Sequence, residues 1–324
     1  MATFTCPRCF FSGSADPALR FCPRCGLADV QQVAAVDGAP IELTVGNRAI
    51  RVLDRLAIGS ISTIYRCRFT SGKTEREGVF KIARDARTND LLANEADILR
   101  RLHNADSDRR FAGFLPRIEE SFVHGDDARL ANVLGFHQDI RSIDELYTLE
   151  EVLAHHRGGL DSRDMAWIWR RLLNVLGFVH SQQIVHGAVL PMHVLIEPAE
   201  HKLVLIDFCG AVRDAAKNRL PLAIIARGYD RWYPPEVRSK QPPTAALDVS
   251  MAARCMIKLT GGDASRAEFS PTMEPALAAY FRRCLSGVNV EAWRLLDDFD
   301  RLIETLWGPR KFRVLTMPAK RSVN

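Results

Sequence analysis

Four cysteines near the start of the chain have the spacing of a metal site. Cys6 and Cys9 form one C-x2-C pair, and Cys22 and Cys25 form a second pair after a twelve-residue loop. Two intervening residues let both sulfurs of a pair face one ion, and four thiolates suit the tetrahedral coordination of Zn²⁺. A redox pair or free thiols are the alternatives. We expect these cysteines to bind a structural Zn²⁺.

The segment around the cysteines is similar to a zinc ribbon over residues 1–28, which is too short to fold around an apolar core without metal. Aromatic rings and arginines lie among the cysteines: Phe4, Phe10, Phe11, Phe21, Arg8, Arg20 and Arg24. They could stack on single-stranded nucleic acid, contact a protein partner, or pack the ribbon's own core. The small number of positive charges favours packing. Residues 29–44, which include Gly38-Ala39-Pro40, are expected to be a linker that runs into a first strand.

A strand and the helix after it each carry one charge at an apolar position. Lys81 interrupts the apolar strand expected at 79–82. Glu95 falls on the apolar stripe of the helix expected at 89–102, four residues after Leu91. A buried charge needs a partner. An ion pair between Lys81 and Glu95 is one interpretation, and a solvated Glu95 at the edge of the stripe is the other.

The periodicity of apolar residues predicts an α+β chain, with strands first and helices later. Strand-like alternation occurs at 50–59, 62–69, 78–84, 114–123 and 129–137, and helical periodicity at 89–102, 162–181, 244–260, 273–286 and 291–307. The short apolar runs at 193–196 and 202–206 suit a hairpin. We therefore expect a sheet with one helix, followed by a mainly helical part.

The order of these features resembles the protein kinase family over residues 45–307. The resemblance implies a bilobal protein kinase-like fold, with a five-stranded N-lobe containing one helix and a mainly helical C-lobe. Residues 57–65 are similar to the glycine-rich loop, Lys81 to the strand lysine that holds the phosphates of ATP, and Glu95 to the helix glutamate that braces it. The residues that the resemblance assigns to nucleotide binding are Ala57, Gly59, Ser62, Ile64, Val79, Lys81, Glu95 and Asp207.

The segment that corresponds to the catalytic loop departs from the family pattern H-R-D-L-K-P-x-N. Ala188 stands in the place of the catalytic aspartate, Leu190 in that of the lysine, and His193 in that of the metal-binding asparagine. Alanine cannot act as a base, and a base typically contributes about 10²- to 10⁴-fold in rate. Histidine is a poor ligand for a hard cation. We expect no efficient phosphotransfer and assign no catalytic residue.

Asp207-Phe208-Cys209 is similar to the metal-binding D-F-G motif of the family. Asp207 follows a buried-type strand, so we expect it to contact a nucleotide together with Mg²⁺ or Mn²⁺. Residues 207–236 contain neither Ser nor Thr, and Gly187 replaces the arginine that would pair with a phosphorylated segment. Activation by phosphorylation of this segment is therefore not expected.

Charge and hydropathy limit the classes of partner. The chain has 324 residues, with 44 Lys+Arg and 39 Asp+Glu, and all five surplus positive charges lie after Glu304. The body is thus neutral, which does not indicate a general polyanion-binding surface. Apolar runs are all shorter than the roughly 18 residues needed to span a bilayer, and the N-terminal residues do not resemble a signal peptide. We expect a cytoplasmic protein with no membrane contact.

Three functions are compatible with these features. The leading hypothesis is an ATP-binding pseudokinase that acts as a signalling scaffold or allosteric regulator of a protein partner. The second is an active serine/threonine-type phosphotransferase with a rearranged site. The third is an adaptor whose zinc ribbon and basic tail, residues 308–324, bind a protein or nucleic acid. For residues 308–318, docking against the helical part is the preferred interpretation.

Overall fold

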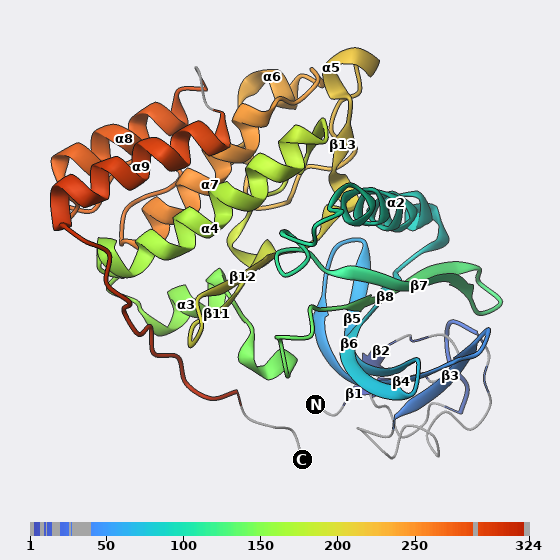
Figure 1. Cartoon of the computed structure of the whole chain (residues 1–324). Coiled ribbons are helices and arrows are strands. Elements are labelled where there is room, and N and C mark those ends of the chain that lie inside the picture. The colour runs from blue at the N-terminus through green and yellow to red at the C-terminus, as the bar shows by residue number, and fades with distance from the viewer. Residues whose placement is uncertain are drawn as a thin grey trace. The chain divides into compact units, whose positions relative to one another are not determined.

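The chain divides into two units, which are described separately. The computed structural model describes residues 3–6, 10, 12–14, 20–25, 27, 40–287 and 291–320 (Figure 1). The first unit comprises the described residues up to Ala96 together with Arg117–Phe136, and the second comprises Asp97–Pro116 and the described residues from His137 onward. Within these described ranges, we find no helix with the length and apolar character that a membrane crossing requires.

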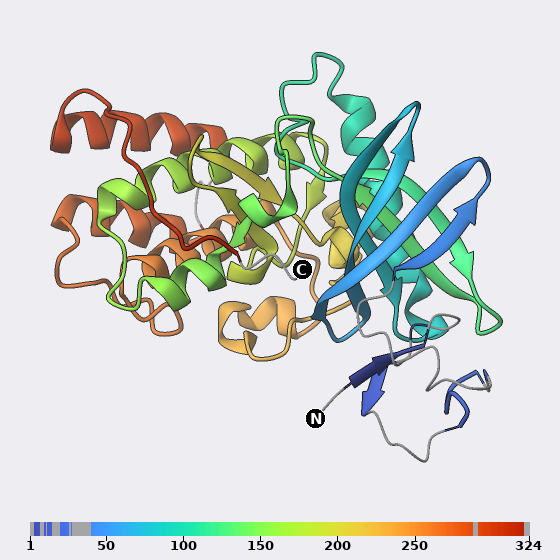
Figure 2. The ribbon, with the colours of Figure 1, turned by 90° about the horizontal axis from the view of Figure 1, so that it is seen from below.

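An antiparallel sheet of six strands forms the first unit, in the order β3-β4-β5-β6-β8-β7 (Figure 2). Its strands are β3 (Ile41–Val45), β4 (Arg48–Ile58), β5 (Ser62–Ser71), β6 (Thr74–Ala83), β7 (Arg117–His124) and β8 (Arg129–Gly135). The short strands β1 (Thr3–Thr5) and β2 (Ser12–Ser14) pair with each other, and helix α2 spans Asn89–Ala105. The five expected strands and the helix are present.

The first edge of the sheet differs from the expectation. Residues 41–44, which the sequence assigned to the linker 29–44, form β3 together with Val45 and pair with β4, from Ile41 opposite Val52 to Val45 opposite Arg48. Alternate residues of this segment are half-buried, which is the period-2 pattern of a strand with one covered face. Residues 29–39 of the expected linker lie outside the described residues.

Alternate residues on one face of the sheet make the core of the first unit. The buried members are Ile50, Val52, Tyr65, Cys67, Phe69, Phe80, Ile82, Ala131 and Val133, and Phe10 belongs to the same cluster. Phe10 is 3% exposed, and its ring lies 5.4 Å from that of Tyr65 and 5.1 Å from that of Phe80, centroid to centroid. The hydroxyl of Tyr65 also donates a hydrogen bond to the carbonyl oxygen of Phe10, at 3.3 Å. Phe10 therefore packs on the sheet, whereas the sequence interpretation had kept the phenylalanine rings inside the ribbon's own core.

The second unit is mainly helical (Figure 1). Its helices are α3 (Leu149–His155), α4 (Ser162–Ser181), α5 (Ala215–Asn218), α6 (Pro235–Arg238), α7 (Ala245–Leu259), α8 (Pro275–Leu285) and α9 (Ala292–Trp307). Its short strands are β9 (Tyr147–Thr148), β10 (Ile184–Val185), β11 (Val194–Glu197), β12 (Lys202–Leu205) and β13 (Val212–Arg213). The β11–β12 hairpin and the four long helices agree with the expectation.

Helix α4 is the central helix of this unit. Asp161 caps its first turn by accepting a hydrogen bond from the backbone N–H of Arg163, at 2.8 Å. Most of its residues are buried, because α4 packs against α7 and α9. The loop after α4 carries His186, Ala188 and His193, so this packing holds the polypeptide that bears the candidate site.

Candidate functional site

Lys81 and Glu95 form a buried ion pair in the first unit. Lys81 Nζ lies 2.9 Å from Glu95 Oε1, and the two side chains are 4% and 1% exposed. Asn132 on β8 pairs with Lys81 across the strands, and its side-chain nitrogen donates to Glu95 Oε2 at 3.3 Å and to the Leu92 carbonyl at 2.9 Å. Both carboxylate oxygens of Glu95 are thus satisfied, as a buried charge requires. The ion-pair hypothesis is confirmed.

Asn132 is a participant that the sequence interpretation missed. Ser121 Oγ donates to Asn132 Oδ1 at 2.8 Å, so the amide is held at both ends. The sequence does contain a signal for Asn132. It is a polar residue inside the apolar run Leu130–Gly135, and a buried amide, like the buried Lys81, needs hydrogen-bond partners.

The strands around Lys81 present a row of small and apolar side chains on one face of the sheet. Ala57 pairs with Ile64, and Ile64 pairs with Lys81, so the three side chains lie in one row across β4, β5 and β6. Val79 lies two residues before Lys81 on the same face. Ala57 is exposed, and Ile64 and Val79 are half-buried. Such a surface offers apolar contact beside one fixed positive charge.

The turn between β4 and β5 is closed by its backbone. The N–H of Gly59 donates to the carbonyl oxygen of Ser62 at 2.8 Å, and a Cβ added at Gly59 would lie 3.3 Å from that oxygen. Ser62 is 2% exposed, so its hydroxyl does not face solvent. Arg84 donates to the Gly59 carbonyl at 3.2 Å, and its own carbonyl oxygen accepts a hydrogen bond from Arg24 at 2.5 Å. The second cysteine pair is therefore linked through Arg24 to the turn.

Three of the four expected zinc ligands come together. The sulfurs of Cys6, Cys22 and Cys25 lie within 4.8 Å of one another, and those of Cys6 and Cys25 are 3.7 Å apart. A ZnS₄ tetrahedron with bonds of about 2.3 Å has sulfur–sulfur edges of about 3.8 Å, and a disulfide is far shorter. Cys6 and Cys22 are buried and Cys25 is half-buried. These donors fit Zn²⁺, and the fourth expected ligand, Cys9, lies outside the described residues.

In the second unit, Asp248 holds the loop after α4. Its carboxylate accepts hydrogen bonds from the backbone N–H groups of His186 at 2.7 Å and Gly187 at 2.8 Å, and from His180 Nε2 at 2.9 Å. His186 accepts at Nδ1 from the N–H of Ala188 (3.2 Å) and donates from Nε2 to the Ile206 carbonyl (3.0 Å). Complete burial lowers the pKa of His186 to about 4, so the ring is neutral at pH 7.

Asp207 and His193 meet in the same unit. His193 Nε2 lies 3.0 Å from Asp207 Oδ2, and His193 Nδ1 lies 2.8 Å from the Ala188 carbonyl oxygen. The backbone of Asp207 is left-handed, with φ of 66°. Such a conformation is uncommon outside glycine and frequent at functional sites. The residue in the asparagine position thus contacts the carboxylate that the sequence assigns to metal or nucleotide.

The segment 207–236 lies directly on the catalytic-loop position. A Cβ built at Gly187, whose φ is +75°, would lie 2.5 Å from Leu222 Cδ2, and one at Gly210 would lie 2.9 Å from Ile224 Cγ2. An arginine at 187 would therefore collide with Leu222. Farther along, the Tyr229 hydroxyl donates to Glu150 Oε1 at 2.7 Å, and burial together with that carboxylate raises the pKa of the tyrosine.

The described part of the tail docks on the second unit, as preferred from the sequence. Leu315 is buried, Tyr147 donates to the Pro318 carbonyl at 2.9 Å, and the Phe312 ring stacks on His201 with centroids 4.1 Å apart. Basic side chains of the tail pair with carboxylates, in the pairs Arg310–Asp300, Arg313–Asp164 and Lys320–Glu151. In the described part of the tail, three of the four basic side chains therefore pair with carboxylates of the same unit.

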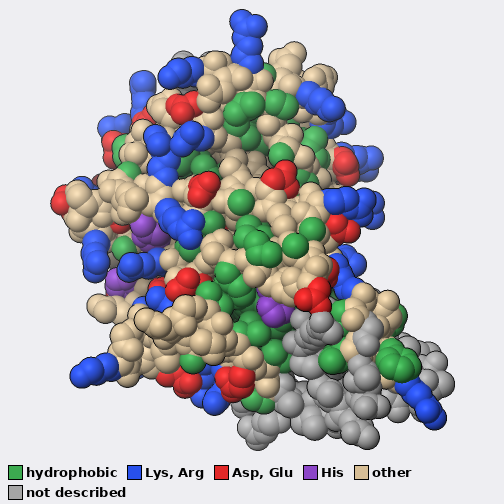
Figure 3. Space-filling model, turned by 90° about the vertical axis from the view of Figure 1, so that its right-hand side faces the viewer, with side chains coloured by type: hydrophobic (Ala, Val, Ile, Leu, Met, Phe, Trp, Pro, Cys, Tyr) green, Lys and Arg blue, Asp and Glu red, His purple; other side chains and the backbone are tan. Residues whose placement is uncertain are grey.

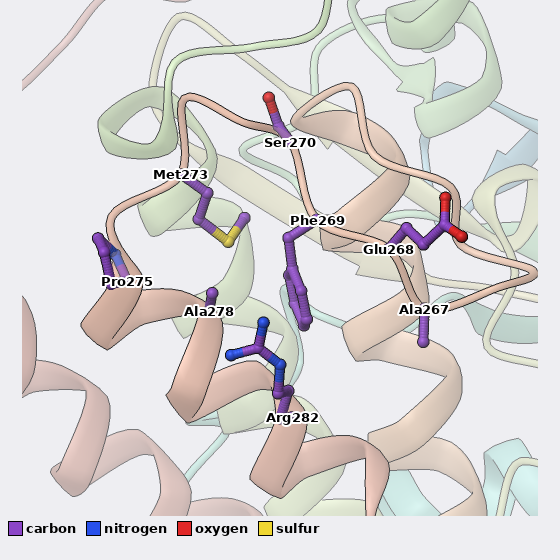
Figure 4. Close-up of a pocket in the computed structure, with 8 residues that line it drawn as sticks. All are labelled: Ala267, Glu268, Phe269, Ser270, Met273, Pro275, Ala278 and Arg282. Carbon is purple, nitrogen blue, oxygen red and sulfur yellow. The ribbon is translucent and has the colours of Figure 1, made fainter.

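A hollow on the second unit is lined by residues far along the sequence from those expected to form the functional site. Its volume is about 520 Å³, and the lining residues come from 267–282 (Figure 4). Within it, the guanidinium of Arg282 lies over the ring of Phe269, 4.9 Å from the centroid. None of the residues expected to bind nucleotide or metal lines this hollow, so it plays no part in the candidate site.

Comparisons with known proteins agree with this architecture. No protein-family model matches the chain. Over 202 residues it is 23% identical to serine/threonine-protein kinase B of Synechocystis, which covers 58% of this chain and 30% of the relative. Over 214 residues it is 24% identical to serine/threonine-protein kinase PAK mbt of Drosophila melanogaster, covering 65% of this chain and 29% of the relative. The chain thus spans less than a third of the length of either relative.

Among solved structures, the BubR1 kinase domain matches with a TM-score of 0.60 and 14% identity, over 82% of this chain and 83% of that one. A likeness at this level of identity shows the fold. The chain therefore has an α+β protein kinase-like fold, with an antiparallel sheet and one helix in its N-terminal part and helices in its C-terminal part, and it contains a protein kinase-like domain.

Proposed function

We propose that this chain is an ATP-binding pseudokinase that acts as a signalling scaffold or allosteric regulator of a protein partner. One observation carries the proposal: the buried Lys81–Glu95 pair is kept, while alanine stands at position 188. A lysine held in this way can neutralise phosphate charge, and alanine offers no base for a substrate hydroxyl. Binding without efficient transfer is the consequence.

The surroundings of position 188 support the loss of phosphotransfer. Leu190, in the place of a lysine, is completely buried and offers no positive charge to a phosphoryl group. Leu222 packs on Gly187, next to Ala188 in the chain. The loop that would receive a phosphoacceptor is therefore covered by the chain's own side chain, and restoring one aspartate at 188 would leave that cover in place.

The proposal is tested by thermal denaturation with increasing ATP. A ligand that binds only the folded state stabilises it by RT ln(1 + [L]/Kd), about 2.7 kcal/mol at a hundredfold excess over Kd. We expect this rise for the wild-type chain and its loss in the double variant Lys81→Met/Glu95→Gln, which leaves no unpaired buried charge. Lys73→Met, at an exposed turn of the same unit, is the matched control and retains the rise. No rise in the wild type, or an equal rise in the double variant, contradicts the proposal.

An active phosphotransferase is the second candidate, because Asp207 is kept. Positioning and electrostatics supply most of the catalysis of phosphoryl transfer, so loss of the base lowers the rate without forbidding the reaction. Transfer of radiolabel from ATP to a protein, to a small molecule or to the chain itself, abolished by Asp207→Asn, would establish this function. Absence of transfer with all three classes of acceptor would exclude it in favour of the pseudokinase.

For residues 1–28 we propose a structural zinc ribbon with Cys6, Cys9, Cys22 and Cys25 as ligands. The convergent sulfurs of the three described cysteines support it. Elemental analysis is expected to find about one zinc per chain, lost in Cys22→Ser/Cys25→Ser and kept in Cys284→Ala, whose cysteine is buried in α8. Absence of zinc from the purified wild-type chain would contradict the assignment.

An adaptor that binds nucleic acid through the ribbon and the tail is the third candidate. On the face seen in Figure 3, basic and acidic side chains are interspersed. Arg310, Arg313 and Lys320 already pair with carboxylates, which weakens the electrostatic attraction that nucleic acid needs. Salt-sensitive retention on RNA, lost on truncation at residue 308, would favour the adaptor, and unchanged retention after truncation would exclude a role for the tail.

A further inference from the structure

Arg24 joins the cysteine segment to the sheet of the first unit by two contacts. Its Nη2 donates a hydrogen bond to the carbonyl oxygen of Arg84, at 2.5 Å, and its Nε lies 3.1 Å from Asp127 Oδ2. Arg84 follows the last residue of β6, and Asp127 lies in the turn between β7 and β8. A guanidinium is planar and its donors have fixed directions, so two contacts at different points of the sheet set its orientation.

A second arginine makes the same pair of contacts from inside the sheet. Arg129 Nε donates to Asp127 Oδ2 at 2.8 Å, and Arg129 Nη1 donates to the carbonyl oxygen of Ala83 at 2.9 Å. Arg129 is 1% exposed, so its charge needs such partners. Asp127 therefore bridges a buried arginine of the sheet and Arg24 of the cysteine segment, and the two arginines hold consecutive carbonyl groups at the end of β6.

The end of β6 also holds the turn that the sequence assigns to nucleotide binding. The backbone N–H of Arg84 donates to the Ile61 carbonyl at 2.8 Å, and its guanidinium donates to the Gly59 carbonyl at 3.2 Å. Within the turn, the N–H of Gly59 donates to the Ser62 carbonyl at 2.8 Å. Arg84 thus accepts a hydrogen bond from Arg24 and donates to two carbonyl groups of the turn. A continuous series of hydrogen bonds therefore connects the cysteine segment with the turn.

The position of Arg24 in the chain connects this series to the proposed zinc site. Cys22 lies two residues before Arg24 and Cys25 directly after it, and the sulfurs of both, with that of Cys6, are close enough together for one ion. Zinc bound to these sulfurs would fix the short backbone segment that carries Arg24. A ribbon of this length has too small an apolar core to hold the segment in the absence of metal.

We infer that Arg24 is a positioning residue for the nucleotide site: it braces the turn at residues 59–62 through Arg84, so that ATP binds more tightly to the zinc-loaded chain. The inference rests on the proposed ATP binding and the proposed zinc ribbon, and it deepens the first by giving the same site a regulator. Because linkage is reciprocal, bound ATP raises the affinity for zinc by the factor by which zinc raises the affinity for ATP.

Hydrogen exchange in the absence of ATP tests the brace by itself. In Arg24→Gln, the peptides that contain Gly59 to Ser62 and Arg84 should exchange about tenfold faster than in the wild type, because a hydrogen bond from a charged donor is lost. Arg20→Gln is the matched control, since Arg20 is an exposed arginine of the same segment, and its exchange should equal that of the wild type. Equal exchange in Arg24→Gln and the wild type overturns the inference, whether or not ATP binds.

A second variant removes the same contact from the side of the sheet. Asp127→Asn takes away the carboxylate that Arg24 and Arg129 share and leaves the cysteine segment unchanged. It should speed the exchange of the same two peptides, and Arg24→Gln added to it should cause a smaller further increase than Arg24→Gln causes alone. A full further increase would show that the two residues act separately, and would overturn the proposed connection.

Isothermal titration with ATP tests the effect on the nucleotide site. We expect the dissociation constant of Arg24→Gln to be at least about threefold higher than that of the wild type, and that of Arg20→Gln to agree within about twofold. Removal of zinc with EDTA, followed by dialysis, should weaken ATP binding by the wild type and change that of Arg24→Gln by less. Equal affinities of the wild type and Arg24→Gln overturn the inference and leave the proposed function standing. Absence of ATP binding by the zinc-loaded wild type overturns the proposed function, and the inference with it.

Discussion

Replacing Phe10 by alanine tests whether the proposed zinc ribbon shares its core with the sheet. The Phe10 side chain is 3% exposed and its ring lies within 5.4 Å of the rings of Tyr65, Phe80 and His124, centroid to centroid. Truncation of a buried phenylalanine costs about 3–5 kcal/mol, from lost burial, lost ring contacts and the cavity that remains. Phe10 has a positive φ of 54°. Alanine, like phenylalanine, is an L residue with a Cβ, so the backbone strain is the same in both chains and the difference in unfolding free energy reports the lost side chain.

The assay is urea denaturation of the zinc-loaded chain, with the free energy of unfolding as the measured quantity. Phe21→Ala is the matched control, because Phe21 belongs to the same segment and is 60% exposed, and its loss should stay within about 0.5 kcal/mol. Chelation of zinc should destabilise the wild type and have little further effect on Phe10→Ala, since both changes release the same contact. A loss below about 1 kcal/mol for Phe10→Ala would refute the shared core.

Three further changes have definite expected outcomes. Lys81→Met alone should lower the free energy of unfolding by about 3–5 kcal/mol, because it leaves the buried Glu95 without its ion-pair partner. Adding Glu95→Gln should restore most of this loss. Additive losses for the two changes would contradict an energetic coupling between Lys81 and Glu95. Gly187→Arg should lower the free energy of unfolding by at least about 2 kcal/mol more than Gly228→Arg does. Both glycines have a positive φ, but of the two only Gly187 has side-chain atoms within 4 Å of an added Cβ. Equal losses would contradict the packing of the segment 207–236 on Gly187. Burial lowers the pKa of His186 to about 4, so His186 binds a proton more readily in the unfolded chain than in the folded one. Lowering the pH from 7 to 5 should therefore reduce the free energy of unfolding by about 2 kcal/mol through this group, while the NMR signal of the folded chain stays that of a neutral ring. A ring that titrates near pH 6.5 in the folded chain would contradict this.

Long periodic segments were the most predictable part of the fold. Helix α4 runs from Ser162 to Ser181, as its 3.6-residue pattern predicts, since one face must pack against α7 and α9. The start of strand β3 was placed too late, because the alternating residues after Gly38-Ala39-Pro40 were assigned to the end of the linker that leads into the first strand. A strand this short gains its stability from pairing with β4, which no local pattern reveals.

The candidate site was predictable only where a residue conflicted with its surroundings. Lys81 and Glu95 each stood out as a charge at an apolar position, and a pair was the physical solution. Contacts such as that of Leu222 with Gly187 could not be predicted, because Leu222 lies in the segment 207–236, whose sequence has no helical or strand periodicity to show where it runs. The contact between His193 and Asp207 likewise arises because the β11–β12 hairpin brings its two ends together, which sequence spacing does not reveal.

Hydrogen exchange with mass spectrometry, with and without ATP, tests the central claim of nucleotide binding most directly. The account predicts slower exchange of backbone amides in two separate peptides on adding ATP: one containing the turn at residues 59–62, and one containing Asp207 to Gly210. The peptide of the exposed turn around Lys73 should not change. Unchanged exchange in both peptides at saturating ATP, or protection confined to other segments, would contradict nucleotide binding at these residues.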